Sequence, residues 1–278
     1  MEIYKDDKKN ISISAKEIKI GKNVTFGKNI AIKCKGEFSV GDYSRIGNNA
    51  EIYGNNISFG KHLFNSSGLR IGGGGRLYPN ANFSIKDRCT IHNNFINVCE
   101  PVVIGSDVGL SPDVSIITHG YWQSVLEGYP ASFSGVNIDD GVIVGYRSII
   151  LMGVSISKNS VIGSQSVVTR NCDEENGIYT GNPAKFRRHV KPLSKLEKHQ
   201  KIEEIVKNYY PIAEYHGFKP EIKIDYPYIQ MNEFRFNAET FDYKGKEDEF
   251  TDDFRDYMRK YGIRIYTERN FASKFSFN

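Results

Sequence analysis

The residue of this chain best suited to acid–base chemistry is His119. It lies in the segment ITHGYWQSVLEGYPASFSGVN (117–137), which also holds Tyr121 and the single tryptophan of the chain, Trp122. An imidazole, with an ordinary pKa of about 6.5, can take a proton from an attacking hydroxyl or amine at neutral pH. An isolated loop histidine is more often a surface residue without a role, so the elements that hold His119 decide its interpretation. Tyr121 and Trp122 lie beside it and are candidates for contact with an acceptor.

The sequence on both sides of this segment repeats every six residues. From residue 138 onward every sixth residue is aliphatic, and four residues after each of the first five comes a valine or a serine. The aliphatic positions are Ile138, Val144, Ile150, Ile156, Ile162 and Val168, and the positions that follow them are Val142, Ser148, Val154, Ser160 and Ser166. The same spacing returns in shorter runs from Ile20 to Ile32, from Val40 to Ile52, from Ile85 to Ile91 and from Ile104 to Ile116.

A period of six fits neither an amphipathic helix nor an alternating strand. It fits a chain that coils with three short flat faces per turn, so that the aliphatic residue of each face points into a narrow interior. Stacked turns of this kind bury a continuous aliphatic ladder, and glycine, asparagine or aspartate supplies the tight corners. The sequence therefore predicts a parallel β-helix. The period stops at 118–137, where a loop leaves the scaffold, and such loops often carry function.

This repeat resembles that of the hexapeptide-repeat acyltransferases over roughly residues 18–188. The resemblance, and not the period, implies a left-handed β-helix. The expected fold is thus an all-β core, a left-handed parallel β-helix, with a C-terminal α+β extension. Proteins of this family are usually trimers with active sites between neighbouring subunits, which implies a homotrimer here. The expected domains are residues 1–188, with the inserted loop 118–137, and residues 189–278.

The resemblance extends to candidate catalytic residues. ITHG matches the place of the family's catalytic histidine, which implies that His119 is the general base. FINVCEPVVIGSDVGLSPDV resembles the family's F-x-N-x-x-C stretch, whose asparagine contacts the acceptor hydroxyl. Here it is Asn97, although an asparagine at this place also suits a structural ladder or corner. The backbone N–H of Tyr146, after Gly145, matches the group that holds the acetyl carbonyl. The group that orients His119 stays open among Glu127, Asp113, Asp139 and a backbone carbonyl.

The end of the repeat carries the most specific motif. VIGSQSVVTRNC and GIYTGNPAKFRR resemble the family's closing signature, VIGAGSVVTKD followed by GNPAKxxR. Acetyl-CoA lying along the helix needs backbone groups for its pantetheine arm and cations for its phosphates. The match implies Gly145, Gly163, Ser164 and Thr169 for the acetyl and pantetheine part, and Arg170, Lys185 and Arg188 for the phosphates or adenine. Arg170 replaces the usual lysine and keeps its charge, whereas Ile143 replaces a frequent aromatic residue and weakens any close substrate analogy.

Two further segments lie outside this pattern. GGGG (72–75), between Arg70 and Arg76, lacks GxxxxGK[ST] and is followed by no helical pattern, so it predicts an excursion from the scaffold more than a phosphate loop. After residue 188, apolar residues at helical spacing predict a helix in LSKLEKHQKIEEIVKNYYPIAEYHGF that Pro211 bends or ends, and a second helix in EDEFTDDFRDYMRKYG stopped by Gly262. EIKIDYPYI and IRIYTE predict strands. We expect this extension to pack on neighbours or to recognise a large acceptor.

Composition excludes several classes. A net charge of +4 is too mild for a dedicated nucleic-acid binder. No apolar run approaches the roughly 18 residues of a membrane span, and no signal peptide is visible, so we expect a cytoplasmic protein. The cysteines show no CxxC spacing, and no histidines pair about five residues apart as in β-helix carbonic anhydrases, so no metal is expected. The cysteines are Cys34, Cys89, Cys99 and Cys172.

Together these features predict an O-acetyltransferase. Its substrates would be acetyl-CoA and a sugar hydroxyl, as in a cell-surface polysaccharide of the capsule, O-antigen or sialic acid type. The acceptor would attack directly, with no covalent acyl-enzyme. The alternatives are N-acetylation of an amino sugar nucleotide and a non-catalytic β-helix scaffold, and loss of activity on substitution of His119 would exclude the scaffold.

Overall fold

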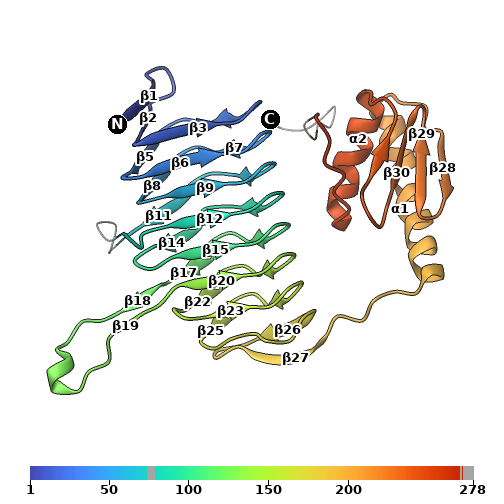
Figure 1. Ribbon diagram of the computed structural model, residues 1–278. Helices are drawn as coiled ribbons and strands as arrows, with labels where there is room; N and C mark the ends of the chain where they lie inside the picture. Colours follow the sequence, from blue (N-terminus) through green and yellow to red (C-terminus); the bar gives the residue numbers. More distant parts are fainter. Residues whose placement is uncertain (74–78, 270, 272–278) are drawn as a thin grey trace. The chain divides into compact units, whose positions relative to one another are not determined.

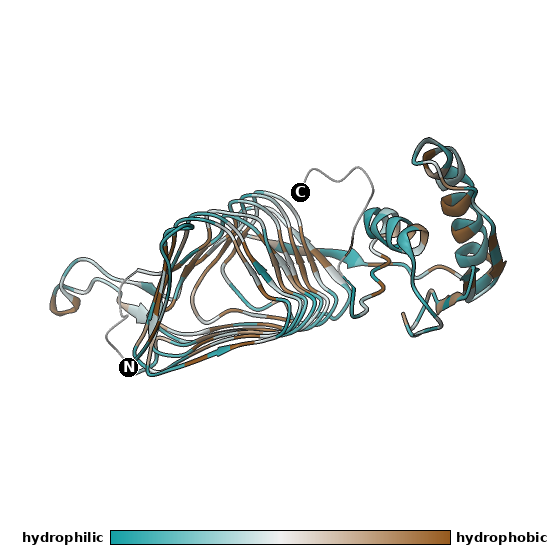
Figure 2. Cartoon of the chain, turned by 90° about the horizontal axis from the view of Figure 1, so that it is seen from above, coloured by the Kyte–Doolittle hydropathy of each residue, from teal (hydrophilic) through white to brown (hydrophobic). Residues whose placement is uncertain are grey.

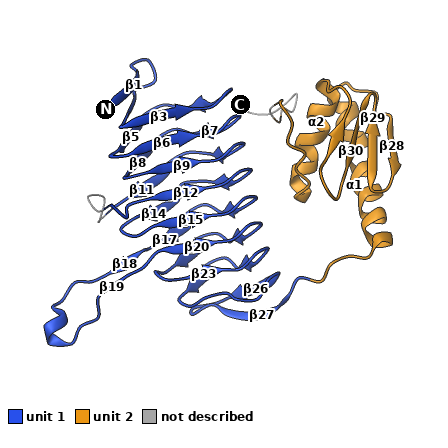
Figure 3. Ribbon diagram, viewed as in Figure 1, with its two compact units in different colours: residues 1–190 blue, residues 191–278 orange. Residues whose placement is uncertain are grey.

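The computed structural model of the 278-residue chain describes residues 1–73, 79–269 and 271. The chain forms two compact units, residues 1–190 and 191–278 (Figure 3). Their boundary lies two residues beyond the one expected from the change in composition.

The first unit is a solenoid of about eight turns over residues 11–179 (Figure 1). Each turn visits three sheets of parallel strands in one order, and we call them sheets A, B and C. Sheet A comprises β2 (Ile11–Ala15), β5 (Ile30–Cys34), β8 (Ala50–Gly54), β11 (Arg70–Gly72), β14 (Phe95–Asn97), β17 (Ser115–Ile116), β22 (Ile149–Ile150) and β25 (Val167–Val168), with β1 (Glu2–Asp6) antiparallel at its edge. The fold predicted from the six-residue period is confirmed.

Sheets B and C complete each turn. Sheet B comprises β3 (Glu17–Ile20), β6 (Glu37–Val40), β9 (Ile57–Phe59), β12 (Phe83–Ile85), β15 (Val102–Ile104), β20 (Val136–Ile138) and β23 (Ser155–Ile156). Sheet C comprises β4 (Thr25–Phe26), β7 (Arg45–Ile46), β10 (Phe64–Asn65), β13 (Thr90–Ile91), β16 (Gly109–Leu110), β21 (Ile143–Val144), β24 (Val161–Ile162) and β26 (Gly177–Thr180), with β27 (Lys185–His189) antiparallel at its end.

The interior of the solenoid is the aliphatic ladder that the period predicts. The six ladder residues from Ile138 to Val168 are each at most 2% exposed, and they fall on sheets B, C and A in turn. Figure 2 looks along the stacked turns and shows the three-sided interior. Two residues of the Ile20–Ile32 run are less buried, Ile20 at 38% exposure and the half-buried Phe26, because both lie in the first turn, at the open end of the solenoid.

The serines of the repeat satisfy backbone groups at the corners. Ser148 Oγ donates to the carbonyl of Gly163 at 3.0 Å, and Ser166 Oγ accepts from the N–H of Gly181 at 3.1 Å. Both serines are fully buried, so these bonds remove the cost of burying a hydroxyl without a partner.

An arm leaves the solenoid between β17 and β20 (Figure 1). It consists of β18 (His119–Gly120), a short 3₁₀ helix η1 (Val125–Glu127) and β19 (Ser132–Phe133), and β18 pairs antiparallel with β19. The loop expected at 118–137 is therefore a hairpin whose base is fixed by strand pairing. Of the glycine run at 72–75, residues 74 and 75 lie outside the described residues, and so does Arg76.

The second unit contains both predicted helices, α1 (Lys195–Tyr215) and α2 (Glu249–Met258), followed by η2 (Arg259–Tyr261). Helix α1 does not end at Pro211, which lies inside it. Gly262 caps η2 with a φ of 75°, as a stop signal requires. EIKIDYPYI supplies strands of an antiparallel sheet. IRIYTE does not form a strand, and the Ile265 carbonyl accepts from Arg255 Nε at 3.0 Å in place of a neighbouring strand. The sheet comprises β28 (Ile222–Asp225), β29 (Tyr228–Met231), β30 (Phe234–Asn237) and β31 (Tyr243–Lys244).

Candidate functional site

His119 lies at the base of the arm, where the chain leaves sheet A. Its Nδ1 is 2.8 Å from the side-chain oxygen of Asn97, which lies in the preceding turn, on strand β14 of sheet A. Asn97 is only 1% exposed. The imidazole is therefore attached to the rigid scaffold through its Nδ1, and its other nitrogen, Nε2, is left for chemistry.

The orientation of the Asn97 amide follows from its other partners. Its Nδ2 donates to the carbonyls of Gly72 (3.2 Å) and Gly73, so its Oδ1 is the acceptor face. That oxygen also accepts from the Thr118 hydroxyl at 2.5 Å and from the N–H of Cys99 at 3.2 Å. An acceptor opposite Nδ1 requires that Nδ1 carry the proton, which leaves the lone pair on Nε2. Nε2 is then the atom that can act as a general base.

Asn97 thus answers the question that the sequence left open. The three carboxylates considered as partners of His119 lie elsewhere: Glu127 is in η1 on the arm, and Asp113 contacts Asn93 and Arg147. Asp139 follows β20 on the B side of the solenoid. The predicted contact of Asn97 with an acceptor hydroxyl stays a prediction, and the geometry adds a second role, that of positioning His119.

An aromatic group surrounds the imidazole. The His119 ring centroid is 5.4 Å from that of Tyr121 and 6.2 Å from that of Phe133. The rings of Tyr121 and Phe133 stack on each other, with their centroids 5.4 Å apart. Phe133 belongs to no motif and was missed from the sequence, because only the pairing of His119 with Phe133 across the hairpin brings it there. Of the two predicted acceptor contacts, Tyr121 lies against His119, whereas Trp122 is 88% exposed.

The predicted oxyanion donor lies at a different corner. Gly145 and Tyr146 form the corner between sheets C and A, and the next turn places Gly163 and Ser164 beside them, with Gln165 N–H bonded to the Tyr146 carbonyl at 2.8 Å. A Cβ on Gly145 would lie 2.5 Å from the backbone nitrogen of Ser164. The glycine is required by this close approach of two turns.

His119 belongs to the corner between sheets A and B. Gly120 lies against Met152 at this corner, and Thr169 and Arg170 occupy the same corner one turn further on, after β25. Tyr146 precedes Met152 by six residues of nearly extended chain, so the two corners are separated by up to roughly 20 Å. His119 and the Tyr146 N–H therefore lie at opposite ends of the strands of sheet A.

The remaining predicted cations lie at the end of the solenoid. Lys185 and Arg188 are exposed on β27, which pairs antiparallel with β26. Ser164, Thr169 and Arg170 are also exposed. An elongated, phosphorylated substrate requires exposed cations for its phosphates and accessible backbone N–H and C=O groups along its length.

Other chemistry finds little support near His119. Burial raises the pKa of the Cys99 thiol, with a smaller contribution from Glu100, which disfavours the nucleophilic thiolate. Across residues 1–73, 79–269 and 271, no three His, Cys, Asp or Glu side chains gather as they would around a metal ion. Within the same residues, no helix has the length and apolar character for crossing a membrane.

The fold and the site together define a parallel β-helix protein with a positioned histidine at the base of an arm. No family model matches the chain. A candidate acetyltransferase of Saccharomyces cerevisiae is 38% identical over 120 residues, which cover 42% of this chain and 58% of that protein. The galactoside O-acetyltransferase of Escherichia coli is 27% identical over 163 residues, 55% of this chain and 67% of that enzyme.

Among solved structures, an N-acyltransferase from Bacillus cereus in complex with dTDP and coenzyme A is 17% identical, covers 70% of this chain and 91% of its own, and gives a TM-score of 0.47. A match at this level does not transfer function. The hexapeptide repeat and the solenoid, together with these sequence relatives, show that the chain resembles the hexapeptide-repeat acetyltransferases. The chain spans just over half the length of two fungal candidate acetyltransferases: 58% of the Saccharomyces cerevisiae protein and 56% of one from Schizosaccharomyces pombe.

Proposed function

We propose that the protein transfers an acetyl group from acetyl-CoA to a sugar hydroxyl, with His119 as the general base. The observation that carries this proposal is the hydrogen bond between Asn97 and His119 Nδ1, because it fixes the tautomer that leaves Nε2 basic. The family supports acetyl transfer, and the galactoside O-acetyltransferase relative supports a sugar acceptor. A cell-surface polysaccharide of the capsule, O-antigen or sialic acid type is the acceptor that we expect.

The reaction is a direct displacement. Nε2 of His119 takes the proton of the acceptor hydroxyl as its oxygen forms a bond to the acetyl carbon. The N–H of Tyr146 donates to the carbonyl oxygen as that oxygen gains negative charge. When the carbon–sulfur bond breaks, the imidazolium returns the proton to the leaving sulfur, so that free CoA thiol and the acetyl ester are the products.

Because the two corners lie at opposite ends of the strands of sheet A, we propose that a second subunit completes the site. His119 of one subunit and Tyr146 of its neighbour can face one acetyl group only if the A–B corner of one solenoid meets the C–A corner of the next. Two isoleucines, Ile143 and Ile149, flank the C–A corner with 37% of their surface exposed, and exposed aliphatic residues favour a protein contact there. A homotrimer with three such sites would bring the two corners together and would cover Ile143 and Ile149.

The test measures the release of CoA thiol from acetyl-CoA with a panel of neutral, acidic and amino sugars. His119→Ala is expected to lose at least ~10²-fold in rate, the lower end of the effect of a general base. His62→Asn is the matched control and should keep full activity, because His62 is a half-buried histidine between β9 and β10, at the corner between sheets B and C, and asparagine tolerates its positive φ. Retained activity in His119→Ala would refute the assignment, and activity only with amino sugars would favour N-acetylation.

Mixing two inactive proteins tests the shared site. Ser164→Trp places a bulky side chain on the exposed C–A corner, whereas His119→Ala disables the A–B corner. Mixed oligomers contain some sites with both corners intact, so activity should return on co-refolding. If it does not return although mixed oligomers form, each site belongs to a single subunit.

A further inference from the structure

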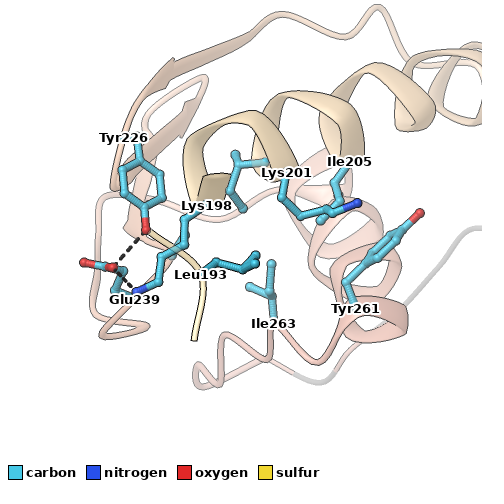
Figure 4. A pocket seen from close by; sticks show the side chains of 10 residues that line it. Leu193, Lys198, Lys201, Ile205, Tyr226, Glu239, Tyr261 and Ile263 are labelled. Carbon is cyan, nitrogen blue, oxygen red and sulfur yellow. Dashed lines mark hydrogen bonds and ion pairs between the residues drawn. The ribbon is translucent and has the colours of Figure 1, made fainter. Parts of the chain in front are cut away.

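The second unit contains a cavity of about 450 Å³ that is lined by its own residues (Figure 4). Roughly 300–1,000 Å³ is usual for a small-molecule site. The lining comes from helix α1 and the residue Leu193 before it, from the turn between β28 and β29, from the segment after β30, and from the segment after α2. All of its lining residues belong to the second unit, so this is a candidate site distinct from the one at His119.

One side of the cavity is aliphatic. Ile202 and Ile205 are three residues apart on α1, so they lie on one helix face, and they are 5% and 2% exposed. Ile263 joins them from the segment after α2, as Figure 4 shows. Ile202 and Ile205 are the buried floor of this side, and the half-buried Ile263 together with Leu193, 46% exposed, supplies the apolar surface that can take a methyl group out of water.

The other side carries a fixed polar cluster. Glu239 Oε1 accepts from Lys198 Nζ at 2.6 Å and from the Tyr226 hydroxyl at 2.8 Å (Figure 4). The hydrogen bond from Lys198 lowers the pKa of Glu239, and desolvation together with the bond to Glu239 raises the pKa of Tyr226 to about 12. The carboxylate therefore stays an acceptor, and the phenol stays a donor, across the physiological range.

This combination fits a particular ligand chemistry. Both donors share Oε1, so the second carboxylate oxygen, Oε2, can accept from a ligand hydroxyl, and Lys198 has further N–H groups for a ligand carbonyl. A plain hexose would place hydroxyl groups against the isoleucines, at a cost for each hydroxyl left without a partner. We propose that this cavity binds a sugar that carries an acetyl group, with the methyl on the isoleucines and the carbonyl and a ring hydroxyl on the polar cluster.

Two sources share this chemistry. An O-acetyl sugar would be the reaction product, and this reading rests on the proposed function; an N-acetyl sugar would be a unit of the acceptor glycan. In either case the second unit holds the glycan while the solenoid acts on another of its residues. The cavity therefore gives the C-terminal extension a role in acceptor recognition.

The experiment is a titration of full-length His119→Ala protein, without acetyl-CoA, with labelled isoleucine methyl groups observed by NMR. The probes are methyl glucoside, its 6-O-acetyl ester and methyl N-acetylglucosaminide. We expect saturable shifts of the Ile202, Ile205 and Ile263 methyls with one or both acetylated sugars, and no shift of Ile229, which lies in the same unit outside the cavity. Response to the ester alone identifies a product site, and response to the acetamide alone identifies an acceptor site.

Variants test the polar cluster. Glu239→Gln removes the carboxylate with little change in shape and should weaken binding at least tenfold, whereas Glu233→Gln, an exposed residue outside the cavity, should leave it unchanged. The proposal is refuted if methyl glucoside binds as tightly as the acetylated sugars, or if Glu239→Gln binds like the parent protein. Because no acetyl transfer takes place in this assay, its result is independent of whether the proposed catalytic function holds.

Discussion

Asn97→Ala is the substitution that most directly tests how the site works. It removes the 2.8 Å contact to His119 Nδ1 while leaving the imidazole in place. A hydrogen bond to a group that becomes charged, as this imidazole does when it accepts the proton, contributes about 1.5–3 kcal/mol. Because the neutral form of this bond, about 0.5–1.5 kcal/mol, already exists before proton transfer, only the difference of about 1–1.5 kcal/mol affects kcat, which should fall roughly 5- to 13-fold. The measurement is CoA thiol release at saturating acetyl-CoA and acceptor.

The structure also predicts a cost in stability that has to be separated from the effect on rate. Asn97 is buried, and its removal leaves the N–H of Cys99 and the carbonyls of Gly72 and Gly73 without this partner. Thr118→Val is the control, because the Thr118 hydroxyl bonds the same Asn97 oxygen without touching the imidazole. It should lower the melting temperature but leave kcat near that of the parent protein.

A double-mutant cycle decides whether Asn97 acts through His119. If it does, Asn97→Ala changes the residual rate little in a His119→Ala background, because the group that it positions is already gone. An equal loss in both backgrounds would contradict the reasoning and favour direct contact of Asn97 with the acceptor. Asn97→Asp gives a second readout: a carboxylate opposite Nδ1 stabilises the imidazolium, so the acidic limb of the pH–rate profile should move to higher pH.

Gly145→Ala should destabilise the solenoid by about 1–3 kcal/mol, because the new Cβ would lie 2.5 Å from the backbone nitrogen of Ser164. Gly109→Ala is the control: the nearest atom to its Cβ is the mobile Cδ1 of Ile143 at 3.1 Å. Thermal unfolding should therefore change little in Gly109→Ala. Arg255→Met should cost about 3–5 kcal/mol, since Arg255 is fully buried and bonds Glu247 at 2.6 Å and Asp252 at 3.0 Å; an unchanged denaturant midpoint would contradict this. Burial raises the pKa of three thiols to about 12 from 9.0, so at pH 8 they should react with a disulfide reagent only as the protein unfolds, and rapid modification of the native protein would refute their burial. Their stabilising effect is complete below pH 9 and should be lost between pH 9 and about 12, which denaturant unfolding across that range would measure. The three thiols are Cys34, Cys89 and Cys172.

Much of the scaffold could be predicted because its rules are local. A six-residue period constrains every turn of the chain in the same way, so the ladder from Ile138 to Val168 could be assigned to the core before any contact was known. The two helices of the second unit follow from helical spacing and end signals. IRIYTE was predicted as a strand and is not one, because a strand needs a neighbouring strand to pair with, whereas the Ile265 carbonyl bonds the buried Arg255 side chain.

The candidate site was only half visible in the sequence. The position of His119 follows from the interruption of the repeat, since a segment that breaks the period must leave the scaffold. Its partner could not be found in this way. Asn97 lies 22 residues earlier, and whether two residues meet across adjacent turns depends on the lengths of all corners and insertions between them. A polar residue on a strand also gives no sign of whether its amide turns inward.

The sequence by itself thus determined the solenoid, its aliphatic interior and the place where the arm leaves the scaffold, because these depend on spacing along the chain. Only the tertiary structure decided the arrangement of the side chains. It placed Asn97 against His119, brought Phe133 across the hairpin to the imidazole, and put Tyr146 at a different corner from His119. These relations depend on which residues become neighbours when turns stack and a hairpin closes, and that physical condition has no counterpart in the order of residues along the chain.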